Sequence, residues 1–162
     1  MAWAHIIDAL AAEQSLSEQE AETLFAAIFD GGVPDLELGG LLALLEQRSL
    51  TQQELVGVLA ALSPRVFQMN ALDTPWRPVL MPSYGAQREQ PNLVPLLALS
   101  LQRLGIPVLA HGMLSGERGV ATAGIFRELG VMPCASLAQA QQVLRDGQVA
   151  FVLTGALAPA LA

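Results

Sequence analysis

The spacing of apolar residues changes once along this chain, near residue 65, and this change constrains the fold more than any other feature. Before it, apolar side chains recur every three or four residues, as along one face of an α-helix. After it, apolar runs of strand length alternate with helical segments of ten or more residues. The sequence therefore predicts an all-helical unit over residues 1–65, a linker and first strand over residues 66–82, and an incomplete α/β domain over residues 83–162.

Two capping boxes punctuate the helical unit. Ser17 is followed three residues later by Glu20, and Thr51 is followed by Glu54. In such a pair the hydroxyl and the carboxylate each accept a backbone N–H at a helix N-terminus. We expect four short helices: one over about residues 3–12, one closed by Gly31-Gly32, one capped by Asp35, and one ending before Ser63-Pro64.

The second part predicts a parallel sheet. Strands separated by helices pair in parallel, and helices then cover both faces of the sheet. The fold class is therefore α/β, with a helical N-terminal unit followed by the first part of a parallel-sheet domain. The expected strands cover residues 78–81, 106–109, 131–132 and 149–153, and the expected helices about residues 92–104, 120–129 and 137–145.

Charge divides along nearly the same boundary. The chain has eight arginines, no lysine and a net charge of −7. Residues 1–70 hold ten acids against two arginines, a net charge of −8, and residues 71–162 hold five acids against six arginines, a net charge of +1. The acidic part repels phosphate polyanions, so any contact with nucleic acid or phosphate is expected after residue 70.

Several classes of protein are excluded by composition. A mean hydropathy of +0.45 argues against intrinsic disorder. The longest apolar stretch, residues 93–110, is interrupted by polar residues, and the first dozen residues lack the basic start of a signal peptide. We therefore expect a cytoplasmic protein with no membrane contact. Cys134 has no partner cysteine, so it predicts a small buried side chain and neither a disulfide nor a metal ligand.

Two segments follow strands where α/β sheets bind their ligands, beyond the carboxyl ends of the strands. Residues 81–92 and 111–119 could present backbone N–H groups and arginines to an anion. Two ordinary loops, with a histidine that only hydrogen-bonds a turn, remain the alternative, since neither segment has a dinucleotide or P-loop pattern. The candidate residues are Ser83, Tyr84, Gly85, Arg88, Asn92, His111, Gly112, Ser115 and Arg118.

These segments carry a resemblance to a known family. Residues 31–40, GGVPDLELGG, and a strand ending in His111-Gly112 resemble the anthranilate phosphoribosyltransferase family, glycosyl transferase family 3. Residues 82–88, PSYGAQR, and 92–98, NLVPLLA, are similar to its YbiB-type branch, whose members are described as DNA-binding proteins. The resemblance runs through almost the whole chain. It implies the N-terminal half of such a protein, with no cofactor and with nucleic acid bound mainly through the absent C-terminal half.

The chain also departs from the transferase pattern. Where the transferases have the loop GTGGDG, this chain has residues 83–88, SYGAQR, and the family's Asn-x-Ser-Thr is kept only at Asn92, before Val94 and Pro95. The family's KHGNRS loop has lost its lysine and arginine here, and its magnesium-binding acidic pair lies in the absent half. The resemblance therefore implies a nucleic-acid-binding protein without transferase chemistry. The alternatives are a phosphoribosyltransferase with an altered acceptor, the only case in which magnesium is expected, and a fragment with no activity of its own.

The resemblance further implies a homodimer through the N-terminal helices. These helices carry more leucine and phenylalanine than four short helices can bury among themselves. Leu41 and Leu45 are the candidate interface residues, and burial inside the unit is the open alternative. The chain stops after the strand at 149–153 with no closing helix in the pattern, so we expect a fragment with an unpaired strand or an uncovered face.

Overall fold

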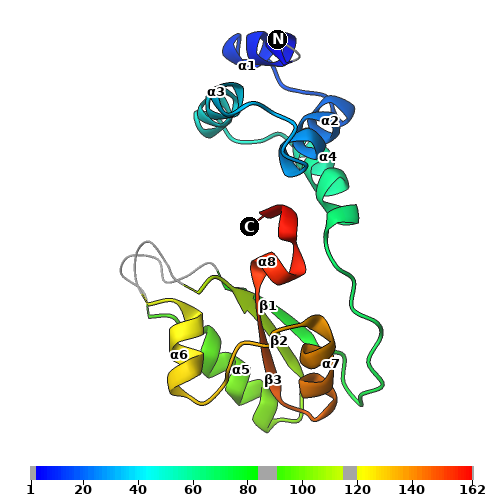
Figure 1. The fold of residues 1–162 in the computed structure, drawn as a ribbon, viewed down its shortest axis with the longest axis vertical. Coiled ribbons are helices and arrows are strands. Elements are labelled where there is room, and N and C mark those ends of the chain that lie inside the picture. The colour runs from blue at the N-terminus through cyan, green and yellow to red at the C-terminus, as the bar shows by residue number, and fades with distance from the viewer. Residues whose placement is uncertain (1–2, 84–90, 115–119, 162) are drawn as a thin grey trace. The chain divides into compact units, whose positions relative to one another are not determined.

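The protein consists of two compact units, Met1–Val66 and Phe67–Ala162 (Figure 1). The computed structural model describes residues 3–83, 91–114 and 120–161. Residues 67–78, predicted as part of a linker, belong to the second unit: the Phe67 N–H donates to the Leu157 carbonyl at 2.8 Å, and Met69 and Leu72 pack against its core.

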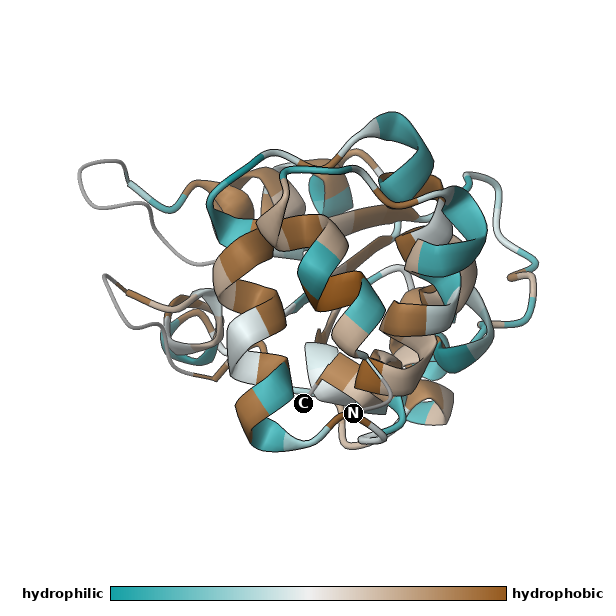
Figure 2. Cartoon of the chain, turned by 90° about the horizontal axis from the view of Figure 1, so that it is seen from above, coloured by the Kyte–Doolittle hydropathy of each residue, from teal (hydrophilic) through white to brown (hydrophobic). Residues whose placement is uncertain are grey.

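The first unit consists of four helices and a closing 3-10 turn. Both capping boxes form at the predicted residues, because hydroxyl and carboxylate satisfy the first N–H groups of the helices that follow. Asp35 is the first residue of its helix and not the cap, since Pro34 occupies the N-cap in extended backbone. Polar and apolar residues alternate along the helices, as in amphipathic helices with one buried face (Figure 2). The elements are α1 (Ala4–Ala11), α2 (Glu18–Phe29), α3 (Asp35–Glu46), α4 (Gln52–Leu62) and the turn Ser63–Arg65.

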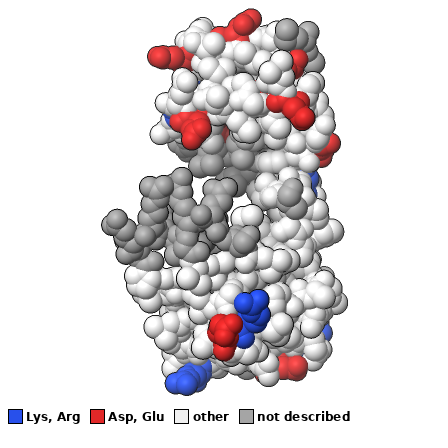
Figure 3. Space-filling view, turned by 60° about the vertical axis from the view of Figure 1, so that its left-hand side comes forward, with Lys and Arg blue, Asp and Glu red and all other residues white. Residues whose placement is uncertain are grey.

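Helices α2 and α4 pack closely because Gly57 has no side chain. A Cβ atom at Gly57 would lie 2.8 Å from the Ala21 Cβ and closer still to the Glu18 carbonyl oxygen. Fully buried Leu24 and Leu41 lie in the core of the unit, together with residues of α1. Several carboxylates of the unit lie on the face shown in Figure 3.

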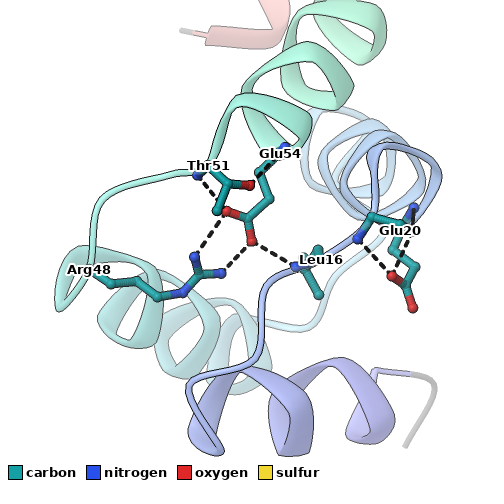
Figure 4. A network of polar contacts seen from close by, with 6 residues as sticks. Leu16, Glu20, Arg48, Thr51 and Glu54 are labelled. Carbon is teal, nitrogen blue, oxygen red and sulfur yellow. Dashed lines mark hydrogen bonds and ion pairs between the residues drawn. The ribbon is translucent and has the colours of Figure 1, made fainter.

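One carboxylate in this unit is buried. Glu54 is fully buried, and its oxygens accept the Arg48 guanidinium, the Thr51 N–H at 2.8 Å and the Leu16 N–H at 2.8 Å (Figure 4). These bonds, with that from Arg48 foremost, lower the pKa of Glu54 to about 2. The carboxylate thus joins the start of α4 to the end of α3 and to the segment between α1 and α2.

The second unit is built on a three-stranded parallel sheet in the order β1-β2-β3, which confirms the predicted fold class. Helices α5 and α6 cover one face, where Phe126 packs on Phe151 with ring centroids 5.5 Å apart. Helix α7 covers the other face through Ala140 and Leu144. The elements are β1 (Val79–Ser83), α5 (Val94–Arg103), β2 (Val108–Gly112), α6 (Thr122–Glu128), α7 (Leu137–Arg145), β3 (Val149–Leu153), α8 (Thr154–Leu157) and the 3-10 turn Pro159–Leu161.

Three details of the second unit differ from the prediction. Residues 131–132 form no strand: only Pro133 bridges to Phe151, beside a 2.7 Å bond from the Cys134 N–H to the Phe151 carbonyl. A proline cannot donate to a ladder, so pairing does not extend there. Strand β2 begins at Val108, after Pro107, and so extends through His111. The short helix α8 follows β3, where no closing helix was expected.

No helix in the described part of the chain is both long and apolar enough to cross a membrane.

Candidate anion-binding site at the carboxyl edge of the sheet

The three strands end together at one edge of the sheet. Ser83 at the end of β1 is in register with Gly112 at the end of β2, which is in register with Leu153 at the end of β3. The chain segments that leave the strands therefore start side by side, at the edge where parallel α/β sheets bind ligands.

Three polar side chains from distant parts of the sequence meet at this edge. The Ser83 and Thr122 hydroxyls are hydrogen-bonded to each other, and the Asn92 Nδ2 donates to the Thr122 Oγ1 at 2.7 Å. Ser83 and Thr122 are buried. Buried polar groups of this kind are normally satisfied, and here they satisfy one another, so the cluster is part of the packing of β1 against α6.

The N-terminus of α5 offers little to an anion. The Val94 N–H donates to the Asn92 Oδ1 at 3.3 Å, and Pro95, in the first turn, has no N–H. Helix N-termini bind phosphate through free N–H groups of the first turn. At two positions of this turn, the local sequence therefore leaves no free N–H group for an anion.

His111 lies near the end of β2, as the motif of a strand ending in His111-Gly112 indicated, and not in the loop that was expected to begin with it. Its Nδ1 lies 3.2 Å from the Thr154 Oγ1 at the start of α8. Burial lowers the pKa of His111 from its usual value, which favours the neutral imidazole. In that form it can exchange hydrogen bonds with a ligand.

Gly112 has a packing role. A Cβ atom at this position would lie 2.8 Å from the Ser83 carbonyl oxygen and 3.4 Å from the Ser83 Cβ. A side chain would therefore push β1 and β2 apart at the edge where the candidate site begins.

The structure thus brings Ser83, Asn92, His111 and Gly112 to one edge. Two further polar residues there, Thr122 and Thr154, were not predicted, although a threonine opening the helix after a strand is a usable signal. The other candidates, Tyr84, Gly85, Arg88, Ser115 and Arg118, lie outside the described residues.

The donor set does not fit a magnesium ion. Magnesium prefers carboxylate and phosphate oxygens, whereas the described side chains at this edge are hydroxyls, an amide and an imidazole. Across residues 3–83, 91–114 and 120–161, no three His, Cys, Asp or Glu side chains gather as metal ligands do.

Cys134 is buried, which raises the pKa of its thiol.

The two candidate interface leucines lie in different settings. Leu41 is fully buried in the core of the helical unit and presents no surface to a second copy. Leu45 packs partly against that core. The exposed leucines of α3 are Leu36 and Leu42, with 90% and 49% of their surface accessible.

The same combination of a helical unit and a parallel α/β unit occurs in known proteins. A family model described as the helical bundle domain of the glycosyl transferase family matches residues 4–63. YbiB of Escherichia coli, an uncharacterized protein, is 36% identical over 91% of this chain and 46% of its own length. An anthranilate phosphoribosyltransferase of Synechococcus is 29% identical over 98% of this chain and 46% of the enzyme.

A solved structure shows the same fold. The crystal structure of anthranilate phosphoribosyltransferase from Thermus thermophilus matches 96% of this chain and 47% of the enzyme with a TM-score of 0.74, at 21% identity. The helical unit thus matches the helical bundle domain of the glycosyl transferase family, and the chain is similar over most of its length to proteins of the anthranilate phosphoribosyltransferase type. Within them it is similar to YbiB, as its motifs indicated. It spans about half the length of the curated relatives it matches.

Proposed function

We propose that the protein is a nucleic-acid-binding member of this family, with DNA as the expected ligand, and that it does not transfer phosphoribosyl groups. The observation that carries the proposal is the N-terminus of α5. Where the transferases have hydroxyl residues for phosphate, this chain has Val94, whose N–H is bonded to Asn92, and Pro95, which has no N–H. Tight binding of a small diphosphate is disfavoured there.

Charge supports contact through the second part of the chain. The net charge of residues 1–70 is −8, which repels a phosphate backbone, and that of residues 71–162 is +1. In the longer relatives, more than half of the polypeptide lies outside the matched region. We propose that proteins of this type hold most of the nucleic acid with that other half, and that this chain binds weakly, without a cofactor and in the cytoplasm.

Two measurements test the proposal. Fluorescence anisotropy of a labelled oligonucleotide with the purified chain should show binding that weakens as salt rises, because phosphate contacts release counterions. Consumption of phosphoribosyl pyrophosphate with anthranilate and Mg²⁺ should stay at the level without protein. Absence of oligonucleotide binding at low salt would contradict the first statement, and anthranilate-dependent turnover would contradict the second.

A second candidate function is phosphoribosyl transfer to a different acceptor. It is favoured by the similarity to anthranilate phosphoribosyltransferases over 98% of the chain and by Asn92, which stands in the family's motif and lies at the carboxyl edge. Magnesium would be needed, and the described side chains at the edge do not supply its ligands. Acceptor-dependent release of pyrophosphate in the presence of Mg²⁺ distinguishes this candidate from the binder.

We also propose that the helical unit forms a homodimer through exposed leucines. Leu36 is 90% exposed on α3, which makes it available for contact with a second copy of the chain. Leu36→Glu should give a folded monomer in sedimentation, whereas Leu41→Glu should unfold the unit by burying a charge. A monomeric unmodified chain at tens of micromolar would contradict the dimer.

A further inference from the structure

The sheet has a second edge, at which the three strands begin. Helices α5 and α6 follow β1 and β2, and α7 leads into the start of β3, so all three helices end near this edge (Figure 1). The last turn of each helix carries an arginine: Arg103, Arg127 and Arg145. Arg77 lies two residues before β1. All four arginines that the structure describes in this unit therefore lie at the amino edge.

Three of these arginines are available for contacts. Arg127 faces Glu128, with its Nε 3.8 Å from the carboxylate. Arg77, Arg103 and Arg145 are exposed, and within the described ranges they form no ion pair.

Carboxylates at the amino edge offset the positive charge of its arginines, so the electrostatic field of this edge is weak. They are Glu128 and Asp146 at the ends of α6 and α7, and Asp146 accepts a hydrogen bond from Gln142 at 3.0 Å. Long-range attraction of a polyanion to this edge is therefore small, and these arginines would have to contact phosphates directly. Arginines at helix C-termini also compensate the helix dipole. That explanation serves Arg103 and Arg145, but it does not apply to Arg77, which is not on a helix.

An exposed aromatic side chain lies beside Arg77. Trp76 is 58% accessible. Its segment is held in place, because the Thr74 hydroxyl donates to the Trp76 carbonyl at 2.7 Å, Leu72 packs against the core below α7, and Pro75 and Pro78 restrict the backbone. Nucleic-acid bases stack on exposed aromatic rings, and arginine side chains contact phosphates. An exposed indole with a guanidinium next to it is therefore suited to binding a nucleotide.

We propose that the amino edge of the sheet binds single-stranded nucleic acid, with a base stacked on Trp76 and phosphates contacted by Arg77, Arg103 and Arg145. The inference rests on the proposed function and names a surface for it, on the opposite edge from the candidate anion site. A single strand is favoured over a duplex because its bases have free faces for stacking.

The test uses the full chain and a fluorescein-labelled oligothymidylate of 16 nucleotides. Trp76→Ala should weaken binding by about 5- to 100-fold, the range for loss of one stacked base. The pair Arg103→Gln and Arg145→Gln should lower the salt slope by ~1.4, about 0.7 for each lost phosphate contact. The matched control is Leu104→Ala, an exposed apolar residue that follows α5 and is more accessible than Trp76, which should leave affinity unchanged.

Intrinsic fluorescence gives an independent readout. The chain has two tryptophans, so Trp3→Phe leaves Trp76 as the only indole, and its emission should be quenched by the oligonucleotide. Binding that survives Trp76→Ala and the arginine pair but is lost in Arg88→Ala would overturn this inference and leave the proposed function standing. A duplex of the same length that binds as tightly would overturn the choice of a single strand. No binding of either nucleic acid at low salt would overturn both proposals.

Discussion

The two units use polar groups in different ways. In the helical unit the carboxylate of Glu54 is buried. It accepts hydrogen bonds from the Leu16 N–H, the Arg48 guanidinium and the Thr51 N–H, which belong to separate segments. In the α/β unit the buried polar residues of the described part are the uncharged Ser83 and Thr122, and they lie at the carboxyl edge of the sheet. The first arrangement stabilises a small core, whereas the second lies where a ligand would bind. Buried polar groups therefore join separate segments in both units, through a charged carboxylate in one and through uncharged hydroxyls beside the candidate site in the other.

The largest effect should come from removing the buried carboxylate. Glu54→Ala leaves Arg48 unpaired and the Leu16 N–H unsatisfied, so the free energy of unfolding of the helical unit should fall by ~3–5 kcal/mol. The matched control is Glu20→Ala, the same position of the other capping box, which is exposed and should cost much less. Urea denaturation measures both, and equal losses would contradict the distinct role of Glu54.

Acid should weaken the helical unit for the same reason. The pKa of Glu54 is about 2 in the folded protein against 4.5 ordinarily, so the unfolded chain takes up the proton first as pH falls. The stabilisation is complete above pH 4.5 and is lost between 4.5 and about 2, a change on the order of 3 kcal/mol. Denaturation curves from pH 6 to pH 2 should show this loss in the unmodified chain and not in Glu54→Gln.

Glycine substitutions test how closely the helices approach. Gly57→Ala should destabilise the helical unit by ~1–3 kcal/mol, because the added methyl group meets backbone atoms of α2. Gly39→Ala, in the open middle of α3, should stabilise it by ~0.5–1 kcal/mol through helix propensity. Thermal melts of the two variants should therefore move in opposite directions, and a shift of both in the same direction would contradict this packing.

The smallest effect is expected at His111. Burial lowers the pKa of His111, so the unfolded state binds the proton at higher pH than the folded state. The associated stabilisation is present above about pH 6.5, the usual pKa of histidine, and decreases as pH falls below it. Titration of the imidazole resonances by NMR should give a pKa below that value for His111. A pKa above it would indicate an anionic partner at the carboxyl edge.

Local signals in the sequence accounted for much of the fold. Both capping boxes formed at the predicted residues, and the predicted helix at 137–145 and strand at 149–153 match α7 and β3. The strand at 131–132 failed because two apolar residues before a proline cannot extend a ladder. Asp35 entered the first turn of its helix because the proline before it took the cap position.

By itself, the sequence determined the helix starts, the change from helical to α/β packing, and the division of charge, since each depends on residues within a few positions of one another. Only the tertiary structure decided that Glu54 pairs with Arg48 and the Leu16 N–H, that Ser83 meets Thr122 across 39 residues, and that Leu41 is core. A capping carboxylate and a buried ion-pair partner look alike in sequence, because burial depends on which segments the chain brings together.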